Sequence, residues 1–198
     1  MKIERILVID EGPARTAALV GWLQSLFDDD GAVPVLVGGA AVELYTLGAY
    51  TTGDVDLVGS VTPGVVRALE EAGFERHGRH WIHEQAQVFV EFSGDALGPD
   101  EAASWLEIEG QRVRIISVED LLVDRLGAWE YWQSSVDGVN ALLVWQAQKE
   151  RIDVGQLEHR VAQAGWRKAW RSLVQFTQRW ESGEVPAEEV ERWANEGP

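Results

Sequence analysis

Residues 33–58 open with Val33-Pro34-Val35-Leu36-Val37-Gly38-Gly39-Ala40-Ala41-Val42-Glu43-Leu44-Tyr45 and close with Thr51-Thr52-Gly53-Asp54-Val55-Asp56-Leu57-Val58. The β-branched run before Gly38 predicts a strand, and the residues after Gly39 have good helical composition. From Asp54 onward acidic and apolar residues alternate with a period of two, which predicts a strand with both carboxylates on one face. The stretch therefore predicts a strand, a glycine turn, a helix and an acidic strand.

The flanking sequence divides into two parts that differ in predicted secondary structure. Before Ser117 the patterns predict helices at 15–27 and from Pro63 to about Ala72, a turn at 28–31, and strands at 81–83, 87–92, 105–108 and 112–116. From Ser117 onward the patterns predict helix for nearly all residues, with helices at 117–132, 136–149, 154–164, 166–181 and 187–194. We expect an α+β fold: a core of a mixed sheet and helices over residues 1–116, and a helical region over residues 117–198.

The composition of the chain limits the cellular compartments and the binding partners that we expect for it. The chain lacks cysteine, which excludes disulfides and thiolate metal sites and fits a reducing cytoplasm. Its apolar N-terminal stretch, Ile6 to Ile9, is too short for a signal sequence or a membrane span. The 33 acidic and 17 basic side chains give a formal charge of −16, which disfavours extended DNA binding.

The acidic strand carries the candidate chemistry. Side chains two residues apart on a strand lie roughly 6.5 to 7 Å apart at Cα and point the same way, so Asp54 and Asp56 can converge on one metal site. Hard carboxylate oxygens suit Mg²⁺ or Mn²⁺. At Gly38-Gly39 the backbone can approach a phosphate closely, next to the free N–H groups of a helix start. Glu91, on the predicted strand 87–92, is a candidate third carboxylate.

A strand, a glycine pair, a helix and an acidic strand follow one another from Val35–Ala41 to Thr52–Leu57. In this succession the chain resembles the DNA polymerase beta-like nucleotidyltransferase superfamily, most closely its compact prokaryotic, toxin–antitoxin-type members. The resemblance extends over roughly residues 14–130. It implies a partly antiparallel mixed sheet flanked by helices and followed by a helical region.

The resemblance also implies roles for single residues. Gly38 and Gly39, with Thr52 close to them in the motif, would bind the nucleoside triphosphate, while Asp54, Asp56 and Glu91 would ligate the metal. Two positions depart from the family pattern, since Ala40 stands where many members have a serine and Glu91 where aspartate is usual.

Basic side chains offer further candidates. Similar transferases often place a Lys or Arg where Arg125 lies, facing the nucleotide, so Arg125 is a candidate nucleotide-binding residue. The cluster from Arg76 to His80 could bind phosphate or form a solvated hairpin. His80 and His83 are expected on opposite faces of a strand, which argues against a shared metal. The basic stretch 166–171, with Arg179, could contact RNA or an acidic partner, or simply face solvent.

Tryptophan is concentrated in the helical region. Most of these rings are expected to pack helix against helix, although one of them could stack on a base. Seven of the ten tryptophans lie there, namely Trp129, Trp132, Trp145, Trp166, Trp170, Trp180 and Trp193.

The leading hypothesis is a metal-dependent enzyme that transfers a nucleoside monophosphate from a triphosphate to an acceptor hydroxyl and releases pyrophosphate. The acceptor could be tRNA, a protein or a small molecule, and a cognate antitoxin is a candidate partner. The alternative is a noncatalytic nucleotidyltransferase-fold protein that binds a nucleotide or a partner. A third reading, a structural domain with a fortuitous motif, predicts that Asp54 and Asp56 lie far from Gly38-Gly39.

Overall fold

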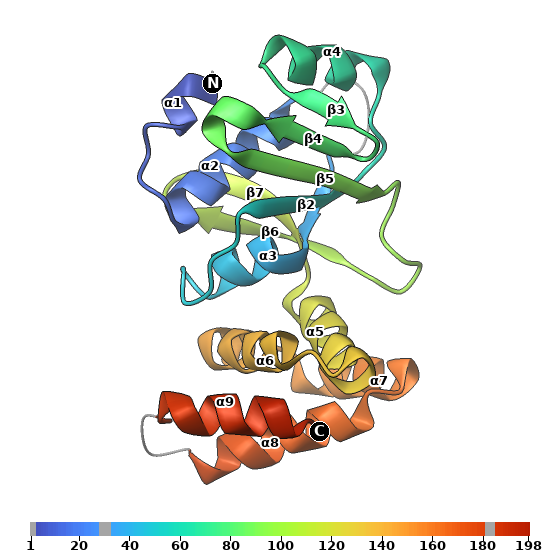
Figure 1. Ribbon diagram of the computed structural model, residues 1–198. Helices are drawn as coiled ribbons and strands as arrows, with labels where there is room; N and C mark the ends of the chain where they lie inside the picture. Colours follow the sequence, from blue (N-terminus) through green and yellow to red (C-terminus); the bar gives the residue numbers. More distant parts are fainter. Residues whose placement is uncertain (1–2, 28–32, 181–184) are drawn as a thin grey trace. The chain divides into compact units, whose positions relative to one another are not determined.

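The computed structural model describes residues 3–27, 33–180 and 185–198, and the chain divides into two compact units, Met1–Ser117 and Val118–Pro198 (Figure 1). The turn predicted at 28–31 lies outside the described residues. Within the described residues, no helix is both long and apolar enough to cross a membrane.

The described residues of the first unit form one mixed seven-stranded sheet in the order β3-β4-β5-β2-β1-β7-β6. Strand β2 is central: it pairs antiparallel with β1 and parallel with β5, and β1 pairs parallel with β7. The predicted α+β class and partly antiparallel sheet are confirmed. The strands are β1 (Val35–Val37), β2 (Asp54–Val58), β3 (Glu75–His77), β4 (His80–His83), β5 (Val88–Gly94), β6 (Ala103–Ile108) and β7 (Gln111–Ile116).

The first unit also contains helices, of which α1 packs on α2. They are α1 (Ile3–Ile6), α2 (Pro13–Ser25), α3 (Gly38–Tyr45) and α4 (Pro63–Glu71), with a short 3₁₀ turn, η1 (Glu84–Ala86). Helix α2 contacts β7, and α3 contacts β1 and β2. The buried Gln24 amide fixes α2 to the sheet, because it donates to the carbonyl oxygens of Pro34 and Arg114 and accepts from the Arg114 N–H. A buried amide requires hydrogen-bond partners for both its NH₂ group and its oxygen, and Gln24 has them.

The structure adds elements that the patterns do not predict. Strand β3 has three exposed side chains and therefore lacks an apolar period, and α1 is only four residues long. Strand β5 begins at Val88 rather than Gln87, since Gln87 takes a left-handed φ of 50°. Strand β1 covers only the last three residues of the predicted run.

The second unit is helical throughout its described elements. They are α5 (Val118–Trp132), α6 (Ser135–Gln148), α7 (Val154–Ala164), α8 (Arg167–Arg179) and α9 (Ala187–Glu196). Trp129 is fully buried, donates its indole N–H to the Ala194 carbonyl at 2.8 Å and packs against Trp193. Trp145 similarly meets Trp170 edge to face. Helix packing is thus confirmed as the role of these rings, whereas Trp132 is 75% exposed.

Candidate active site

The glycine turn places backbone directly against an acidic side chain. Helix α3 begins at Gly38, immediately after β1 ends at Val37. Gly38 has a φ of +67°, and a Cβ added there would lie 2.3 Å from Oδ2 of Asp56. Only glycine tolerates both this backbone conformation and such a close approach. The Asp56 carboxylate therefore lies at the start of α3, which argues against a fortuitous motif.

Both aspartates lie on one face of β2. Val55 and Leu57, between and beyond them, are buried, whereas Asp54 is exposed and Asp56 half-buried. This is the alternation that the sequence predicts, with the apolar side chains anchoring the strand in the core. Asp54 forms no ion pair with any described residue, so its carboxylate can take a ligand.

Strand β5 brings Glu91 to the same face. The parallel register pairs Asp56 with Glu91 and Asp54 with Phe89, and directly paired residues share a face. The alternate residues Val88, Val90 and Phe92 are buried on the other side, as predicted. A cavity of about 220 Å³ borders all three carboxylates together with His77 and His80.

Glu91 is held by basic side chains of the hairpin formed by β3 and β4. Arg79 Nε lies 2.9 Å from one carboxylate oxygen of Glu91, and His80 Nδ1 lies 3.4 Å from the other. The cluster from Arg76 to His80 therefore reaches the acidic face in part. His83 does not join it, because its Nδ1 accepts the Ala86 N–H and its ring meets Phe74 edge-on.

These contacts bear on metal binding. Among residues 3–27, 33–180 and 185–198, no group of three or more His, Asp or Glu side chains is arranged to hold a metal ion. Asp54 and Asp56 supply two hard oxygen donors that fit Mg²⁺ or Mn²⁺. Both oxygens of Glu91 contact Arg79 or His80, so these basic side chains would compete with a cation for the Glu91 carboxylate.

Thr52 connects the approach to β2 with the glycine turn. Its hydroxyl accepts the Asp54 N–H at 3.3 Å, and its N–H donates to Oε2 of Glu43 at 3.4 Å. A Cβ added at Gly39 would lie 3.4 Å from the Thr52 side chain. The structure thus brings Gly38, Gly39, Thr52 and the acidic strand together.

Glu43 lies next to these residues, and its sequence context predicts only that it is part of a helix. Its side chain is 2% exposed and accepts a hydrogen bond from the Thr16 hydroxyl at 3.0 Å. Burial raises the pKa of the Glu43 carboxyl, although the hydrogen bonds from Thr16 and Thr52 act in the opposite direction. One signal was available, since a lone acid within Ala40-Ala41-Val42-Glu43-Leu44-Tyr45 has no polar helix face to occupy.

Known structures resemble this chain in fold. The crystal structure of an antigenic nucleotidyltransferase-like protein from Paracoccidioides brasiliensis matches with a TM-score of 0.59 at 18% identity, over 88% of this chain and 95% of that one. The fold is that of nucleotidyltransferases. The solution structure of the antibiotic-resistance factor ANT(2'')-Ia matches with a TM-score of 0.51 at 17% identity, over 82% of this chain and 97% of that one. No protein-family model and no curated protein matches the sequence.

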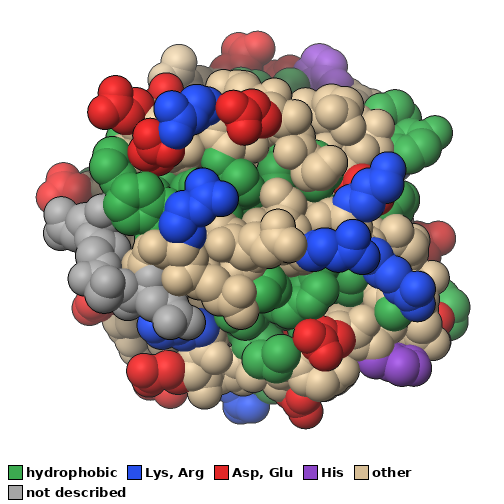
Figure 2. Space-filling model, turned by 90° about the horizontal axis from the view of Figure 1, so that it is seen from below, with side chains coloured by type: hydrophobic (Ala, Val, Ile, Leu, Met, Phe, Trp, Pro, Cys, Tyr) green, Lys and Arg blue, Asp and Glu red, His purple; other side chains and the backbone are tan. Residues whose placement is uncertain are grey.

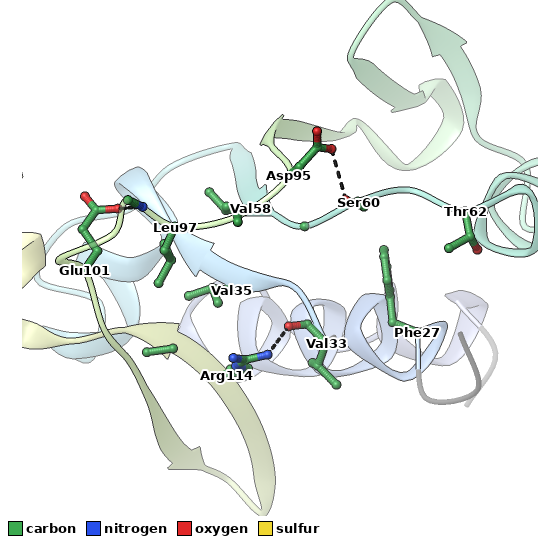
Figure 3. Close-up of a pocket in the computed structure, with 14 residues that line it drawn as sticks. Phe27, Val33, Val35, Val58, Ser60, Thr62, Asp95, Leu97, Glu101 and Arg114 are labelled. Carbon is green, nitrogen blue, oxygen red and sulfur yellow. Dashed lines mark hydrogen bonds between the residues drawn. The ribbon is translucent and has the colours of Figure 1, made fainter. Parts of the chain in front are cut away.

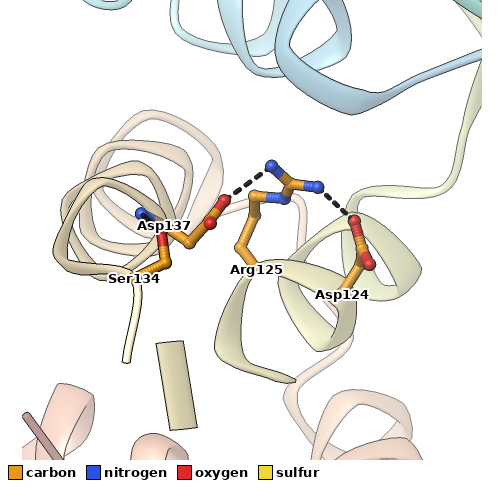
Figure 4. Close-up of polar contacts among 4 residues, drawn as sticks. All are labelled: Asp124, Arg125, Ser134 and Asp137. Atoms are coloured by element: carbon orange, nitrogen blue, oxygen red, sulfur yellow. Dashed lines mark hydrogen bonds and ion pairs between the residues drawn. The ribbon is translucent and has the colours of Figure 1, made fainter. Parts of the chain in front are cut away.

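Arg125, the predicted nucleotide-binding arginine, belongs to the second unit of this nucleotidyltransferase fold. Its guanidinium bridges two carboxylates: Nη1 lies 2.6 Å from Oδ1 of Asp137, and Nη2 contacts Asp124 (Figure 4). The Ser134 hydroxyl accepts the Asp137 N–H and caps α6. Within its unit, Arg125 is therefore a fixed cation between α5 and α6.

A larger cavity of about 380 Å³ lies at the other end of the β1–β2 ladder, where Val35 pairs with Val58 (Figure 3). Its polar contacts join Arg114 to the Val33 carbonyl at 2.6 Å and Ser60 to Asp95 at 3.2 Å. None of the predicted site residues lines it. In this nucleotidyltransferase fold the motif residues therefore gather at the opposite end of the ladder.

The second unit also presents a basic surface. Arg167, Lys168 and Arg171 of α8 are exposed. Figure 2, a view from below Figure 1, shows Lys and Arg side chains spread over this face among Asp, Glu and hydrophobic side chains. No described carboxylate pairs with these three cations. We call them the α8 basic face.

Proposed function

We propose that the protein is a metal-dependent nucleotidyltransferase that moves a nucleoside monophosphate from a triphosphate to an acceptor hydroxyl, with release of pyrophosphate. One observation carries the proposal: the Asp56 carboxylate lies against the positive-φ backbone of Gly38. A phosphate site at a helix start and a carboxylate for a cation are thereby adjacent. The likeness in fold to nucleotidyltransferases supports it.

Each residue has a role in this proposal. Gly38 and Gly39 allow the triphosphate to approach the N–H groups at the start of α3, whose dipole favours negative charge. Asp54 and Asp56 would hold Mg²⁺ or Mn²⁺. The cation, when bound, would neutralise phosphate charge and favour in-line attack by the acceptor hydroxyl. Thr52 would support the nucleotide from the segment that leads into β2.

Glu91 and the hairpin form the second half of the proposed site. Glu91 would complete the carboxylate set when the cation attracts it away from Arg79 and His80. Arg79 would then be available to the triphosphate, because a guanidinium released from one anion readily pairs with another. Arg125 stays a candidate nucleotide-binding residue, although its guanidinium already pairs with Asp124 and Asp137.

For the acceptor we keep three classes: RNA, protein and small molecules. The name of ANT(2'')-Ia, an antibiotic-resistance factor, supports a small molecule, whereas the α8 basic face supports tRNA. Toxin-like action with a cognate antitoxin, in the cytoplasm, is part of the proposal. It rests on the sequence resemblance and the cysteine-free composition.

A noncatalytic protein that binds a nucleotide or a partner is the second candidate. Two observations favour it: Ala40 replaces a serine that is common in the family, and both oxygens of Glu91 contact basic side chains. Such a protein would not need a cation at Asp54 and Asp56. Metal dependence therefore separates the two candidates.

Calorimetric titration with each nucleoside triphosphate, with and without Mg²⁺, tests the proposal. We expect Mg²⁺ to tighten binding to the wild type and not to Asp54→Asn or Asp56→Asn. Asp95→Asn is the matched control, because Asp95 lies at the cavity beyond the other end of the ladder. Binding that is equal with and without Mg²⁺ would favour the noncatalytic candidate.

A further inference from the structure

A buried carboxylate outside the acidic strand calls for an explanation. Glu43 is 2% exposed and lies within α3, the helix that the glycine turn starts. No described Lys, Arg or His side chain forms an ion pair with it. Burying a carboxylate without an opposite charge costs free energy, which only hydrogen bonds here offset. An apolar residue would suit the surroundings of α3 better if packing were the sole requirement.

The two carboxylate oxygens join three segments of the first unit. Oε1 accepts the Thr16 hydroxyl of α2 at 3.0 Å, and Oε2 accepts the backbone N–H of Thr52 at 3.4 Å. Thr52 belongs to the segment between α3 and β2. Glu43 therefore ties that segment to the helices that precede it.

The connection continues into the acidic strand. The Thr52 hydroxyl accepts the N–H of Asp54, the first residue of β2, at 3.3 Å. On its other side, the Thr52 side chain lies close to Gly39. Thr52 is thus fixed at its N–H and at its side chain, and the start of β2 follows two residues later.

A cavity of about 430 Å³ borders this arrangement and is lined by Thr16, Glu43, Thr52 and Asp54, among others. A molecule bound there would lie next to Asp54 and to the group that holds the Thr52 segment. Any displacement of that segment would move Asp54 relative to such a molecule and to the glycine turn.

We propose that Glu43 is a positioning residue, which acts through Thr52 to hold Asp54 in register with the Gly38-Gly39 turn. The proposal rests on the proposed function for its catalytic consequence, although the structural link stands by itself. Displacements of about 1 Å in a reacting constellation can lower rates about a hundredfold, so a buried tether of this kind has an effect out of proportion to its hydrogen bonds.

The test compares two variants of nearly equal shape. Glu43→Met removes both acceptors and keeps the length of the side chain. Glu43→Gln retains an oxygen that can accept the Thr52 N–H and an NH₂ group that can donate to the Thr16 hydroxyl. We expect kcat of nucleotide transfer to fall about tenfold or more in Glu43→Met, with KM for the triphosphate changed less than about threefold, and to stay within about threefold of wild type in Glu43→Gln.

Amide hydrogen exchange supplies the readout that a merely structural role would not move. We expect the Thr52 and Asp54 amides to exchange about tenfold faster in Glu43→Met than in wild type, while other amides of the first unit keep their rates. Thr46→Val is the matched control, since it removes a buried hydroxyl at the C-cap of α3 that donates to the backbone carbonyls of Val42 and Glu43 and not to the Glu43 carboxylate. It should leave kcat and the Thr52 exchange rate unchanged.

The outcomes of these experiments distinguish failure of the tether from failure of the proposed function. Wild-type kcat and wild-type exchange at Thr52 in folded Glu43→Met would overturn the proposal, and so would an equal loss in Glu43→Gln or uniform acceleration of exchange over the whole unit. Should Glu43→Met not fold, Thr16→Val decides, with a smaller change in the same direction expected and no change contradicting it. If wild type itself transfers no nucleotide, the proposed function fails, while the exchange rates still judge the tether.

Discussion

At the residue scale, Gly38 connects the glycine turn to the acidic strand, because it combines a φ of +67° with the close approach of Asp56. Gly78 has the same φ of +67° but no described heavy atom within 4 Å of an added Cβ. A substitution at Gly78 therefore introduces backbone strain alone, whereas the same substitution at Gly38 introduces backbone strain and a clash with Asp56. This makes a matched pair of substitutions informative.

We expect Gly38→Ala to lower the free energy of unfolding by about 1–3 kcal/mol more than Gly78→Ala does, because the new methyl group must displace the Asp56 carboxylate. Triphosphate binding should weaken about tenfold or more in Gly38→Ala alone. Denaturant unfolding and calorimetric titration measure both quantities. Equal effects of the two substitutions would mean that Asp56 does not lie at the turn.

Glu43 gives the chain a predictable pH response. Its pKa is raised by burial, so the folded protein holds this proton more tightly than the unfolded chain. The contribution to stability is full below the ordinary pKa of 4.5 and is lost as pH rises through the raised value. The free energy of unfolding of wild type minus that of Glu43→Gln should therefore fall as pH rises from below 4.5, and then level off. A difference that stays constant or rises over this range would contradict the assignment.

At the element scale, the hairpin of β3 and β4 holds Glu91, the proposed third carboxylate, through its ion pair with Arg79. Exposed ion pairs contribute about 0.2–1 kcal/mol, so freeing Glu91 should have a modest effect. We expect Arg79→Gln to lower the Mg²⁺ concentration that half-saturates triphosphate binding by about two- to fivefold, because an unpaired Glu91 strengthens the negative potential at the cation. At saturating Mg²⁺ the triphosphate itself should bind more weakly, because the guanidinium that would pair with it is gone.

Arg76→Gln is the control for the hairpin substitution. Arg76 lies over the Trp81 ring and donates to the Gly78 carbonyl, away from Glu91. It should leave the Mg²⁺ requirement unchanged. If Arg79→Gln behaves like Arg76→Gln, Glu91 does not take part in cation binding.

The α8 basic face allows an RNA acceptor to be distinguished from a small one. Cations that contact a phosphate backbone make binding depend on salt. We expect the combined change Arg167→Glu, Lys168→Glu and Arg171→Glu to reduce labelling of tRNA at least about tenfold, and to leave labelling of a small-molecule acceptor unchanged. Equal tRNA labelling by this variant and wild type would show that the face is solvated only.

The elements differ in how far sequence predicts them. Strand β2 and the glycine turn follow from alternation and composition, because burial on one face imposes a period of two. Strand β3 has no buried side chain and so leaves no periodic signal. The contacts of Glu91 with Arg79 and His80 depend on strand order and register, which the local sequence does not specify. The tether from Glu43 to Thr52 likewise appears only when α3 and the segment before β2 are folded together.

At the scale of the whole molecule, the chain combines a strongly negative charge with a site that we propose for a negatively charged substrate. The formal charge of −16 opposes binding of a triphosphate and of a nucleic-acid backbone. In the proposed function, three local features would offset this repulsion: the start of α3, a cation at Asp54 and Asp56, and the guanidinium of Arg79. The fold is shared with nucleotidyltransferases, but a fold hosts many chemistries, so the activity has to be established at the site.

The most direct test is transfer of label from each α-³²P nucleoside triphosphate, with Mg²⁺ or Mn²⁺, to tRNA, cell-extract protein or small hydroxyl compounds. The Asp54→Ala/Asp56→Ala variant runs alongside as control. We predict metal-dependent labelling of one acceptor class by wild type and none by the variant. No transfer with any triphosphate, or equal transfer by the variant, would contradict it.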